Sequence, residues 1–395
     1  MRKLVVLVGL FLVGGLAFAA TPGKLLIWAD ETRAPVFREV GEAYTEKTGI
    51  PVEVVEIPFG QLRDQFVTAA PTGEGPDIMI GPHDWVGELV ASGLLAEILL
   101  PPELAAQFDS VSLEAFTYGK LYGLPYIREG VGLLYNKKLV PQVPATFEEL
   151  VELARKLTDP TMPQYGFIVQ NPDPYHSFPF LSALGGYVFG YDEEGKLNPC
   201  DVGLDSPGAI AGAEIFQSLF KEGLVPAGME WETCLTLFCE GRIAMFLTGP
   251  WSVSRARAAG IDFGVVPIPP IQGKDPKPFV GVQGVMVSAF SPNLPIAFDF
   301  LFNYYATKDT MLAIYALDPR IPSFIPAYNE VAADPILKGF AESTANGVPM
   351  PNIPEMSAVW GAWGDAMALI GNLEKTPAEA PKEAADNIRA TLGCK

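Results

Sequence analysis

KLLIWA at residues 24–29, VEVVEI at 52–57 and PDIMIG at 76–81 are the three apolar stretches that decide the fold of this chain. They are short and rich in β-branched residues, which is typical of strands buried on both faces. Between them, apolar residues recur at helical spacing: Val36, Phe37, Val40, Ala43 and Tyr44, then Leu62, Phe66, Ala69 and Ala70. The order βαβαβ predicts a mostly parallel sheet with right-handed crossovers.

Polar and aromatic residues follow the ends of two of these strands. They are Asp30, Glu31 and Arg33 after the first strand, and His83, Asp84 and Trp85 after the third. Ligands of open α/β sheets bind beyond the carboxyl ends of the strands, so we expect a binding site here. We expect His83 to hold a loop by hydrogen bonds rather than to touch the ligand.

The rest of the chain predicts a second α/β lobe, because 395 residues are more than one hydrophobic core usually serves. LYGLPYIREGVGLLYNKKL (121–139) indicates two extended segments that meet at Arg128-Glu129-Gly130, where the chain would leave the first lobe. Helices are expected at Phe147 to Leu157, Ser206 to Lys221, Trp231 to Glu240 and around Pro377 to Leu392. The proline-rich run at 265–284 suits an extended segment that crosses back between the lobes.

The N-terminus has the layout of a secretory signal peptide. Arg2 and Lys3 precede the apolar run LVVLVGLFLVGGL, and Ala17-Phe18-Ala19 supplies small residues for cleavage near Ala19/Ala20. The alternative is a membrane anchor, but the run is shorter than the ~20 residues that span a bilayer. No cysteine follows the cleavage site, so we expect an exported periplasmic protein that is not a lipoprotein.

Composition excludes several classes of partner and of chemistry. A net charge of −19 would repel nucleic acid and anionic lipid. The chain has two histidines and lacks HExxH, GxSxG, GxxxxGK[ST], GxGxxG and CxxC, so we expect no metal, no cofactor and no catalytic residue. A glycosidase needs only two carboxylates around a sugar, and Asp84, Glu129 and Asp173 leave that alternative open.

The four cysteines are Cys200, Cys234, Cys239 and Cys394. Three complete disulfide pairings are possible, and the sequence does not choose among them. Cys234 and Cys239 fall in one expected helix, where a rise of ~1.5 Å per residue puts their Cα atoms beyond disulfide reach. Either that helix is broken, their partners lie elsewhere, or they are free thiols.

Several motifs closely resemble bacterial maltose/maltodextrin-binding proteins of the extracytoplasmic solute-binding family. They run in the family's order from Lys24 to Trp360: KLLIW, TGEGPDIMIGPHD, ASGLLAEI, LPYIREGVGLLYNK, DPYHSFPF, GGYVF, FCEGRIAMFLTGPW, KPFVGVQG and PNIPEMSAVW. The resemblance implies a two-lobed clamp with a hinge of crossing strands. The first lobe would comprise 20–128 and 284–330, and the second lobe 129–283 and 331–395.

The resemblance also implies which residues bind a sugar. By motif position the stacking aromatics are Tyr175, Trp231, Trp251 and Trp360, and the polar groups are Arg33, Asp84, Glu129 and Asp173, with Glu31 a further candidate. Trp231 stands where the family has a tyrosine, and Asp173 where it has a glutamate. The chemistry agrees, because a sugar offers an apolar C–H face to aromatic rings and hydroxyls to charged groups.

Core packing is the alternative for each aromatic residue. Trp251 follows the turn TGP, and Tyr175 lies in the proline-broken loop NPDPYHSFP, so both favour the binding interpretation, whereas Phe178 is expected in the core. Glycine stands at 81, 361 and 364 where the family has tryptophan, tyrosine and arginine. We hypothesise that Trp85 and Trp363 refill part of that space and touch the ligand, so that its length or linkage differs from that of maltose.

The function that the resemblance implies is capture of an α-linked gluco-oligosaccharide by a monomer that delivers it to the membrane permease of an ABC importer. The lobes would close by bending near residues 126–132, 280–284 and 329–334. Another disaccharide such as trehalose or sucrose is the alternative cargo, and the glycosidase is the alternative from another class of protein.

Overall fold

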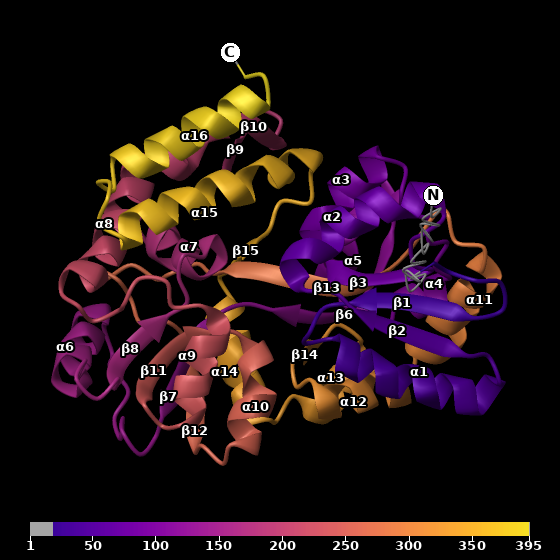
Figure 1. Ribbon diagram of the computed structural model, residues 1–395, viewed down its shortest axis with the longest axis horizontal. Coiled ribbons are helices and arrows are strands. Elements are labelled where there is room, and N and C mark those ends of the chain that lie inside the picture. The colour runs from indigo at the N-terminus through magenta and orange to yellow at the C-terminus, as the bar shows by residue number, and fades with distance from the viewer. Residues whose placement is uncertain (1–18, 395) are drawn as a thin grey trace, which may run out of the picture.

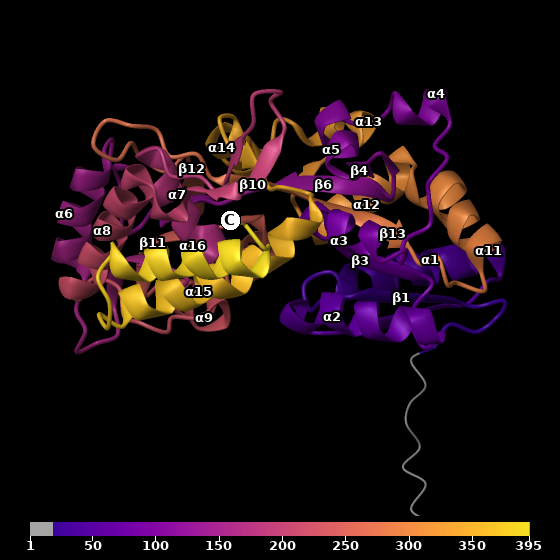
Figure 2. The ribbon, with the colours of Figure 1, turned by 90° about the horizontal axis from the view of Figure 1, so that it is seen from above.

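The computed structural model describes residues 19–394 and consists of two α/β lobes that lie side by side (Figure 1 and Figure 2). The expected signal peptide at 1–19 lies outside the described residues except for Ala19. The first lobe carries the N-terminal strands, and the second carries the two C-terminal helices, α15 (Ser357–Gly371) and α16 (Glu379–Thr391). The expected two-lobed α/β fold is therefore confirmed.

The first sheet has the strand order β14-β6-β13-β3-β1-β2. Its strands are β1 (Leu25–Ala29), β2 (Val52–Glu56), β3 (Ile78–Pro82), β6 (Gly123–Glu129), β13 (Phe279–Val287) and β14 (Ile321–Pro322), and β15 (Val348–Pro349) pairs with one end of β13. The three strands expected from the sequence are parallel, as predicted. The later strands β6, β13 and β14 run antiparallel to their neighbours in this order, so the sheet is mixed rather than mostly parallel.

Side chains of β1 alternate between two hydrophobic cores, which is why an unbroken apolar run forms this strand. Leu25 and Ile27 point into one core, and Leu26 and Trp28 point into the other. The helices that cover the sheet are α1 (Ala34–Thr48), α11 (Leu294–Asp299), α12 (Lys308–Leu317) and α13 (Ile325–Val331) on the first core, and α2 (Phe59–Ala69) and α3 (Val86–Ala91) on the second. The short helices α4 (Pro102–Ala105) and α5 (Ser110–Ala115) complete this lobe.

The second sheet has the strand order β12-β7-β11-β8. Its strands are β7 (Gly132–Asn136), β8 (Tyr165–Val169), β11 (Ile243–Thr248) and β12 (Phe263–Val266). Only β8 and β11 are parallel, so the expectation of a mostly parallel sheet is wrong for this lobe. β7 enters the lobe by direct continuation of the chain from the first lobe, and this connection fixes its direction.

The four helices predicted for the second lobe, at 147–157, 206–221, 231–240 and 377–392, begin within two residues of those positions. Tyr175, expected in a proline-broken loop, lies instead in a helix at 174–183. α6 (Phe147–Leu157) is capped by the hydroxyl of Thr146, and the hydroxyl of Ser206 caps α8 (Pro207–Lys221). The other helices are α7 (Pro174–Ala183), α9 (Trp231–Cys239), α10 (Val253–Ala258) and α14 (Pro335–Thr344). Two small hairpins, β4 (Thr117–Tyr118) with β5 (Lys120–Leu121) and β9 (Phe189–Tyr191) with β10 (Leu197–Val202), lie outside the two sheets.

Two extended segments connect the lobes (Figure 1). β6 passes into β7 through Gly130, where a Cβ atom would lie 2.6 Å from the carbonyl oxygen of Phe279, so this position requires glycine. β13 crosses back, and Phe279 packs in the core of the second lobe while Val285 packs in that of the first. The expected boundaries 128/129 and 283/284 thus fall inside the strands β6 and β13.

The cysteines divide into one bonded pair and two thiols. Cys200 in β10 and Cys394 after α16 form a disulfide, with Cα atoms 5.5 Å apart. Cys234 is buried and free, and Cys239 is partly buried and free. Both lie in the unbroken helix α9, so of the alternatives that the sequence left open for these two cysteines, free thiols is the one that the structure shows.

Candidate functional site

A cavity of about 450 Å³ lies between the two lobes. Small-molecule sites in proteins typically have volumes of ~300–1,000 Å³. Every residue expected at a ligand lines this cavity except Trp363: Glu31, Arg33, Asp84, Trp85, Glu129, Asp173, Tyr175, Trp231, Trp251 and Trp360. The fold therefore brings together residues that are far apart in the sequence.

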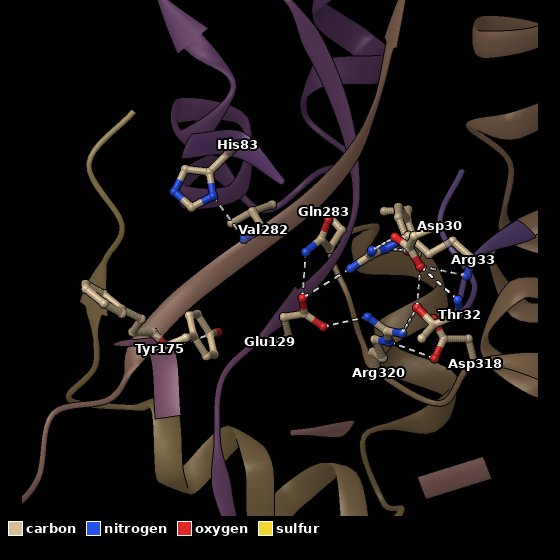
Figure 3. A network of polar contacts seen from close by, with 12 residues as sticks. Asp30, Thr32, Arg33, His83, Glu129, Tyr175, Val282, Gln283, Asp318 and Arg320 are labelled. Carbon is tan, nitrogen blue, oxygen red and sulfur yellow. Dashed lines mark hydrogen bonds and ion pairs between the residues drawn. The ribbon is translucent and has the colours of Figure 1, made fainter. Parts of the chain in front are cut away.

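Glu129, at the end of β6, is the centre of a buried polar network on the first-lobe side of the cavity (Figure 3). Its Oε1 accepts a hydrogen bond from Nε2 of Gln283 at 2.7 Å. Its Oε2 accepts one from Nη1 of Arg320 at 2.7 Å, and Nη2 of Arg33 lies 3.6 Å from Oε1. Because Glu129 is only 4% exposed, these contacts fix its carboxylate in one orientation.

The two arginines of this network are held by further groups. Arg33 forms an ion pair with Asp30, and its Nε donates to the hydroxyl of Tyr126 at 3.1 Å. Arg320 donates from Nε to Oδ1 of Asp318 at 2.7 Å. Two guanidinium groups thus face the carboxyl groups of Asp30, Glu129 and Asp318, a balance that suits a neutral ligand better than an anionic one.

Burial and charge pairing set the protonation of this wall. Burial is the largest single effect on Asp30 and disfavours its charged form, but the guanidinium of Arg33 and the hydrogen bonds from Thr32 together outweigh it and lower the pKa of Asp30 below its ordinary value. For Asp318, burial outweighs Arg320, and the pKa of Asp318 is raised. Burial also opposes the charge on Arg320, yet the carboxyl groups around it raise its pKa well above the ordinary value. Both guanidinium groups therefore stay charged.

Asp84 connects the first lobe to the second. It lies in the one-turn helix η2 (His83–Trp85) after β3, and its Oδ2 accepts a hydrogen bond from the indole Nε1 of Trp360 in α15 at 3.0 Å. Its Oδ1 is buried and has no hydrogen-bond partner among residues 19–394. Burial raises the pKa of Asp84 to about 6, although the bond from Trp360 acts in the opposite direction.

His83 holds a loop, as the sequence predicts. The backbone N–H of Val282 donates to Nδ1 at 3.1 Å, so Nε2 carries the proton and donates to the carbonyl of Met350 at 3.0 Å. Burial lowers the pKa of His83 to about 4, which keeps the ring neutral. His83 therefore ties η2 to β13 and to the segment before α15.

The second lobe contributes a wall of aromatic rings that are half-buried. The ring centroids of Tyr175 and Trp251 lie 6.0 Å apart. The indole Nε1 of Trp231 donates to Oγ of Ser252 at 3.1 Å, and the hydroxyl of Tyr175 donates to the carbonyl of Phe279 at 3.4 Å. Each ring is thus fixed from behind and leaves part of its surface at the cavity.

Asp173 caps helix α7 and so positions Tyr175. Its Oδ1 accepts from the backbone N–H of His176 at 2.9 Å and lies 2.9 Å from the ring Nδ1 of His176. Its Oδ2 accepts from Nε2 of Gln170 at 2.8 Å. Protein groups thus engage both carboxylate oxygens, and a direct contact of Asp173 with ligand stays a prediction.

The expectation that Trp363 touches the ligand is wrong. Its side chain is 1% exposed and lies in the core of the second lobe, against Phe178 and Phe279. Trp360 and Trp363 are three residues apart and so lie on the same side of α15, and the ring of Trp363 stacks behind that of Trp360, with centroids 6.3 Å apart. Phe178 is buried, as predicted.

The family model of bacterial extracellular solute-binding proteins matches residues 39–339, which is more than half of the chain. The chain belongs to this family. A maltotriose-binding protein of Pyrococcus abyssi (strain GE5 / Orsay) is 34% identical to this solute-binding protein over 92% of this chain and 80% of the relative. A galactooligosaccharide-binding protein of Bacillus subtilis (strain 168) is 30% identical over 94% of this chain and 90% of the relative.

The solved structures agree with this assignment. The structure of Thermus thermophilus maltotriose-binding protein bound with maltotriose superposes on this solute-binding protein with a TM-score of 0.89. The two sequences are 34% identical, and the match covers 94% of this chain and 100% of the other. Within residues 19–394, no helix is both long and apolar enough to cross a membrane.

Sequence reasoning missed several residues that line the cavity of this solute-binding protein, among them Phe59, Gln283, Arg320 and Met350. One signal was present for Gln283, which interrupts the apolar strand FVGVQGVMV. Arg320 stands in the short irregular segment before β14, where neither spacing nor a motif marks it.

Proposed function

We propose that this solute-binding protein captures a maltodextrin-type gluco-oligosaccharide between its lobes and delivers it to the membrane permease of an ABC importer. One observation carries the proposal: the cavity has half-buried aromatic rings on its second-lobe wall and a fixed polar network on its first-lobe wall. A sugar needs both kinds of surface, because its C–H faces are apolar and its hydroxyls form hydrogen bonds.

The aromatic and the polar residues of the cavity have different roles in this proposal. Tyr175, Trp231, Trp251 and Trp360 stack on the sugar rings, while Arg33, Asp84 and Glu129, with Asp173 and Glu31, orient the hydroxyls directly or through the residues that they hold. Rings on one lobe and polar groups on the other mean that the ligand contacts both walls only when the lobes are closed. Ligand therefore shifts the population toward the closed state, which the importer reads.

The cargo rests on the relatives, two of which carry the name maltotriose-binding protein. Galactooligosaccharide is a second candidate, since the similar Bacillus subtilis protein is named for it. Trehalose and sucrose remain further candidates on the same scaffold.

We also propose that the protein works without catalysis, as an exported periplasmic monomer whose signal peptide is cleaved near Ala19/Ala20 and which takes no nucleic acid as partner. Support comes from the family and from the relatives, which are described as binding proteins. N-terminal sequencing of the secreted protein tests the cleavage. Incubation with maltotriose, followed by a glucose assay, tests the glycosidase alternative.

The deciding experiment is calorimetric titration of the ligand-stripped protein with glucose, maltose, maltotriose, maltotetraose, trehalose, sucrose and a galactooligosaccharide. Tight one-to-one binding of a maltodextrin, above all other sugars, is the expected result. Preference for the galactooligosaccharide would move the cargo to that class, and binding of none of these sugars by the folded protein would refute the proposal.

A further inference from the structure

A second direct contact between the lobes lies outside the cavity. Ser254, in α10 of the second lobe, donates a hydrogen bond from its Oγ to the carbonyl oxygen of Leu317 at 3.0 Å, at the end of α12 of the first lobe (Figure 1). Neither residue lines the cavity. This bond therefore joins the lobes through groups that do not belong to the ligand site.

Asp334 ties the same two helices together a second time. Its Oδ2 accepts hydrogen bonds from the hydroxyl of Tyr315 in α12 and from Nη2 of Arg257 in α10, both at 2.8 Å. Its Oδ1 accepts from the backbone N–H of Ile336 at 2.8 Å and so caps α14. Burial opposes the charge on Asp334, but these hydrogen bonds outweigh burial and lower its pKa below the ordinary value. Asp334 is therefore a carboxylate that joins one helix of each lobe.

The ring of Tyr315 packs across the boundary between the lobes. Met311 and Ile314, on the same helix α12, lie in the core of the first lobe, whereas Tyr315 packs against the core of the second lobe. Tyr315 and Asp334 are both partly buried, and this partial burial shields their hydrogen bond from water. The helix α12 thus belongs to the first lobe and is held by the second.

The chain connects this contact to both walls of the cavity. Trp251, which lines the aromatic wall, lies three residues before Ser254. On the side of the first lobe, Leu317 directly precedes Asp318, which accepts a hydrogen bond from Arg320 of the buried polar network. The contact between α10 and α12 therefore helps to set the separation of the aromatic wall from the polar wall.

We propose that an interlobe latch positions the two walls of the cavity and so raises the affinity for sugar without touching it. The latch consists of Ser254, Arg257, Tyr315 and Asp334. This inference rests on the proposed function and adds to it residues that position the site. The match to the maltotriose-bound structure extends over 94% of this chain and therefore over both lobes, which indicates that the lobes lie here as in a sugar-bound protein. The latch stabilises only the arrangement in which α10 and α12 meet, so it favours the state that holds the ligand.

The test is calorimetric titration of the wild type and of the double variant Ser254→Ala/Tyr315→Phe with maltose and with maltotriose. The double variant loses the two hydroxyl groups that bridge the lobes but keeps the ring of Tyr315. Its affinity falls by about fivefold or more, and by the same factor for both sugars, because the latch contacts neither of them.

Tyr44→Phe is the matched control. The hydroxyl of Tyr44 also donates to a carboxylate, Oδ2 of Asp299 at 3.1 Å, but both residues belong to the first lobe. Its removal therefore leaves the affinity for both sugars unchanged.

Unchanged affinity of the double variant, or a loss for one sugar alone, would overturn the latch and leave the proposed function standing. A thermal transition of the ligand-free double variant far below that of the wild type would also overturn it, because the bonds would then support the fold rather than position the walls. A wild type that binds neither sugar would refute the proposed function. Small-angle scattering of the ligand-free proteins then decides on the latch: a larger radius of gyration in the double variant supports it, and an equal radius overturns it.

Discussion

The indole of Trp360 donates a hydrogen bond to the carboxylate of Asp84 at 3.0 Å, and this bond joins the two lobes through protein groups alone. The other oxygen of Asp84 is buried and has no hydrogen-bond partner within the described part of the chain. Bringing the lobes together therefore removes water from a carboxylate without replacing all of its hydrogen bonds. Closure and protonation of Asp84 must be coupled.

This coupling predicts how pH affects ligand-free protein. The pKa of Asp84 is raised from 3.8 to about 6 in this structure, where Asp84 contacts Trp360 of the other lobe, so the protonated form should favour this contact between the lobes. This pKa difference corresponds to roughly 3 kcal/mol of free energy that favours closure of the lobes. The full contribution is present below the ordinary pKa of Asp84 and is lost as the pH rises through 6. Small-angle scattering should show a smaller radius of gyration at pH 5 than at pH 7.5.

Asp84→Asn is the control for that experiment, because the amide cannot titrate and its oxygen can still accept the bond from Trp360. A radius that varies equally with pH in the wild type and in Asp84→Asn would contradict the role of Asp84.

Arg320→Met should destabilise the protein by about 3–5 kcal/mol, because it leaves the carboxyl groups of Glu129 and Asp318 buried without their cation. Urea unfolding measures this loss. Arg257→Met is the matched control: Arg257 pairs with Asp334 at a half-exposed site, where a loss of at most about 1 kcal/mol is expected. Similar unfolding midpoints for the two variants would show that the buried network does not stabilise the fold.

Trp251→Ala and Trp363→Ala should have opposite effects, although both remove an indole from the second lobe. Trp251 lines the cavity, so its loss should weaken sugar binding by about tenfold or more with little change in stability. Trp363 is buried in the core, so its loss should cost about 3–5 kcal/mol of stability. Calorimetric titration measures the affinity of both variants, and thermal unfolding measures their stability. A loss of stability in Trp251→Ala together with a loss of affinity in Trp363→Ala would show that the cavity is misassigned.

Removal of the disulfide, as Cys200→Ser with Cys394→Ser, should lower stability by about 2–5 kcal/mol. Sugar affinity should stay the same, since neither cysteine lines the cavity between the lobes. The wild type in reducing buffer should match the double variant. Reduced affinity at a temperature where the variant is folded would mean that the disulfide also shapes the site.

Local pattern explains which parts of the fold were predictable. The βαβαβ order and the start of α6 depend on nearby residues, such as the hydroxyl of Thr146 that caps this helix, and both agree with the structure. The antiparallel placement of β13 between β6 and β3 was not foreseen. Strand pairing over such sequence distances depends on tertiary packing, which periodicity does not report.

Prediction of the candidate site was also limited by tertiary packing, which the sequence pattern does not report. The motif around Trp360 correctly predicted that this residue lines the cavity. The same reasoning predicted a ligand contact for Trp363, which is buried in the core. Only the orientation of the helix decides which of the two indoles faces the cavity, and the sequence does not report it. Arg320 carries no sequence signal, because its importance arises from the approach of Glu129, which belongs to a distant strand.

The order in which β13 joins the first sheet bears on biosynthesis. The strand lies between β6 and β3, so the first core lacks its middle strand until residue 287 has left the ribosome. The growing chain therefore cannot complete the first core until most of it has been synthesised. For a protein proposed to be exported, this delay lengthens the period in which the chain is still unfolded and can pass through a translocation channel.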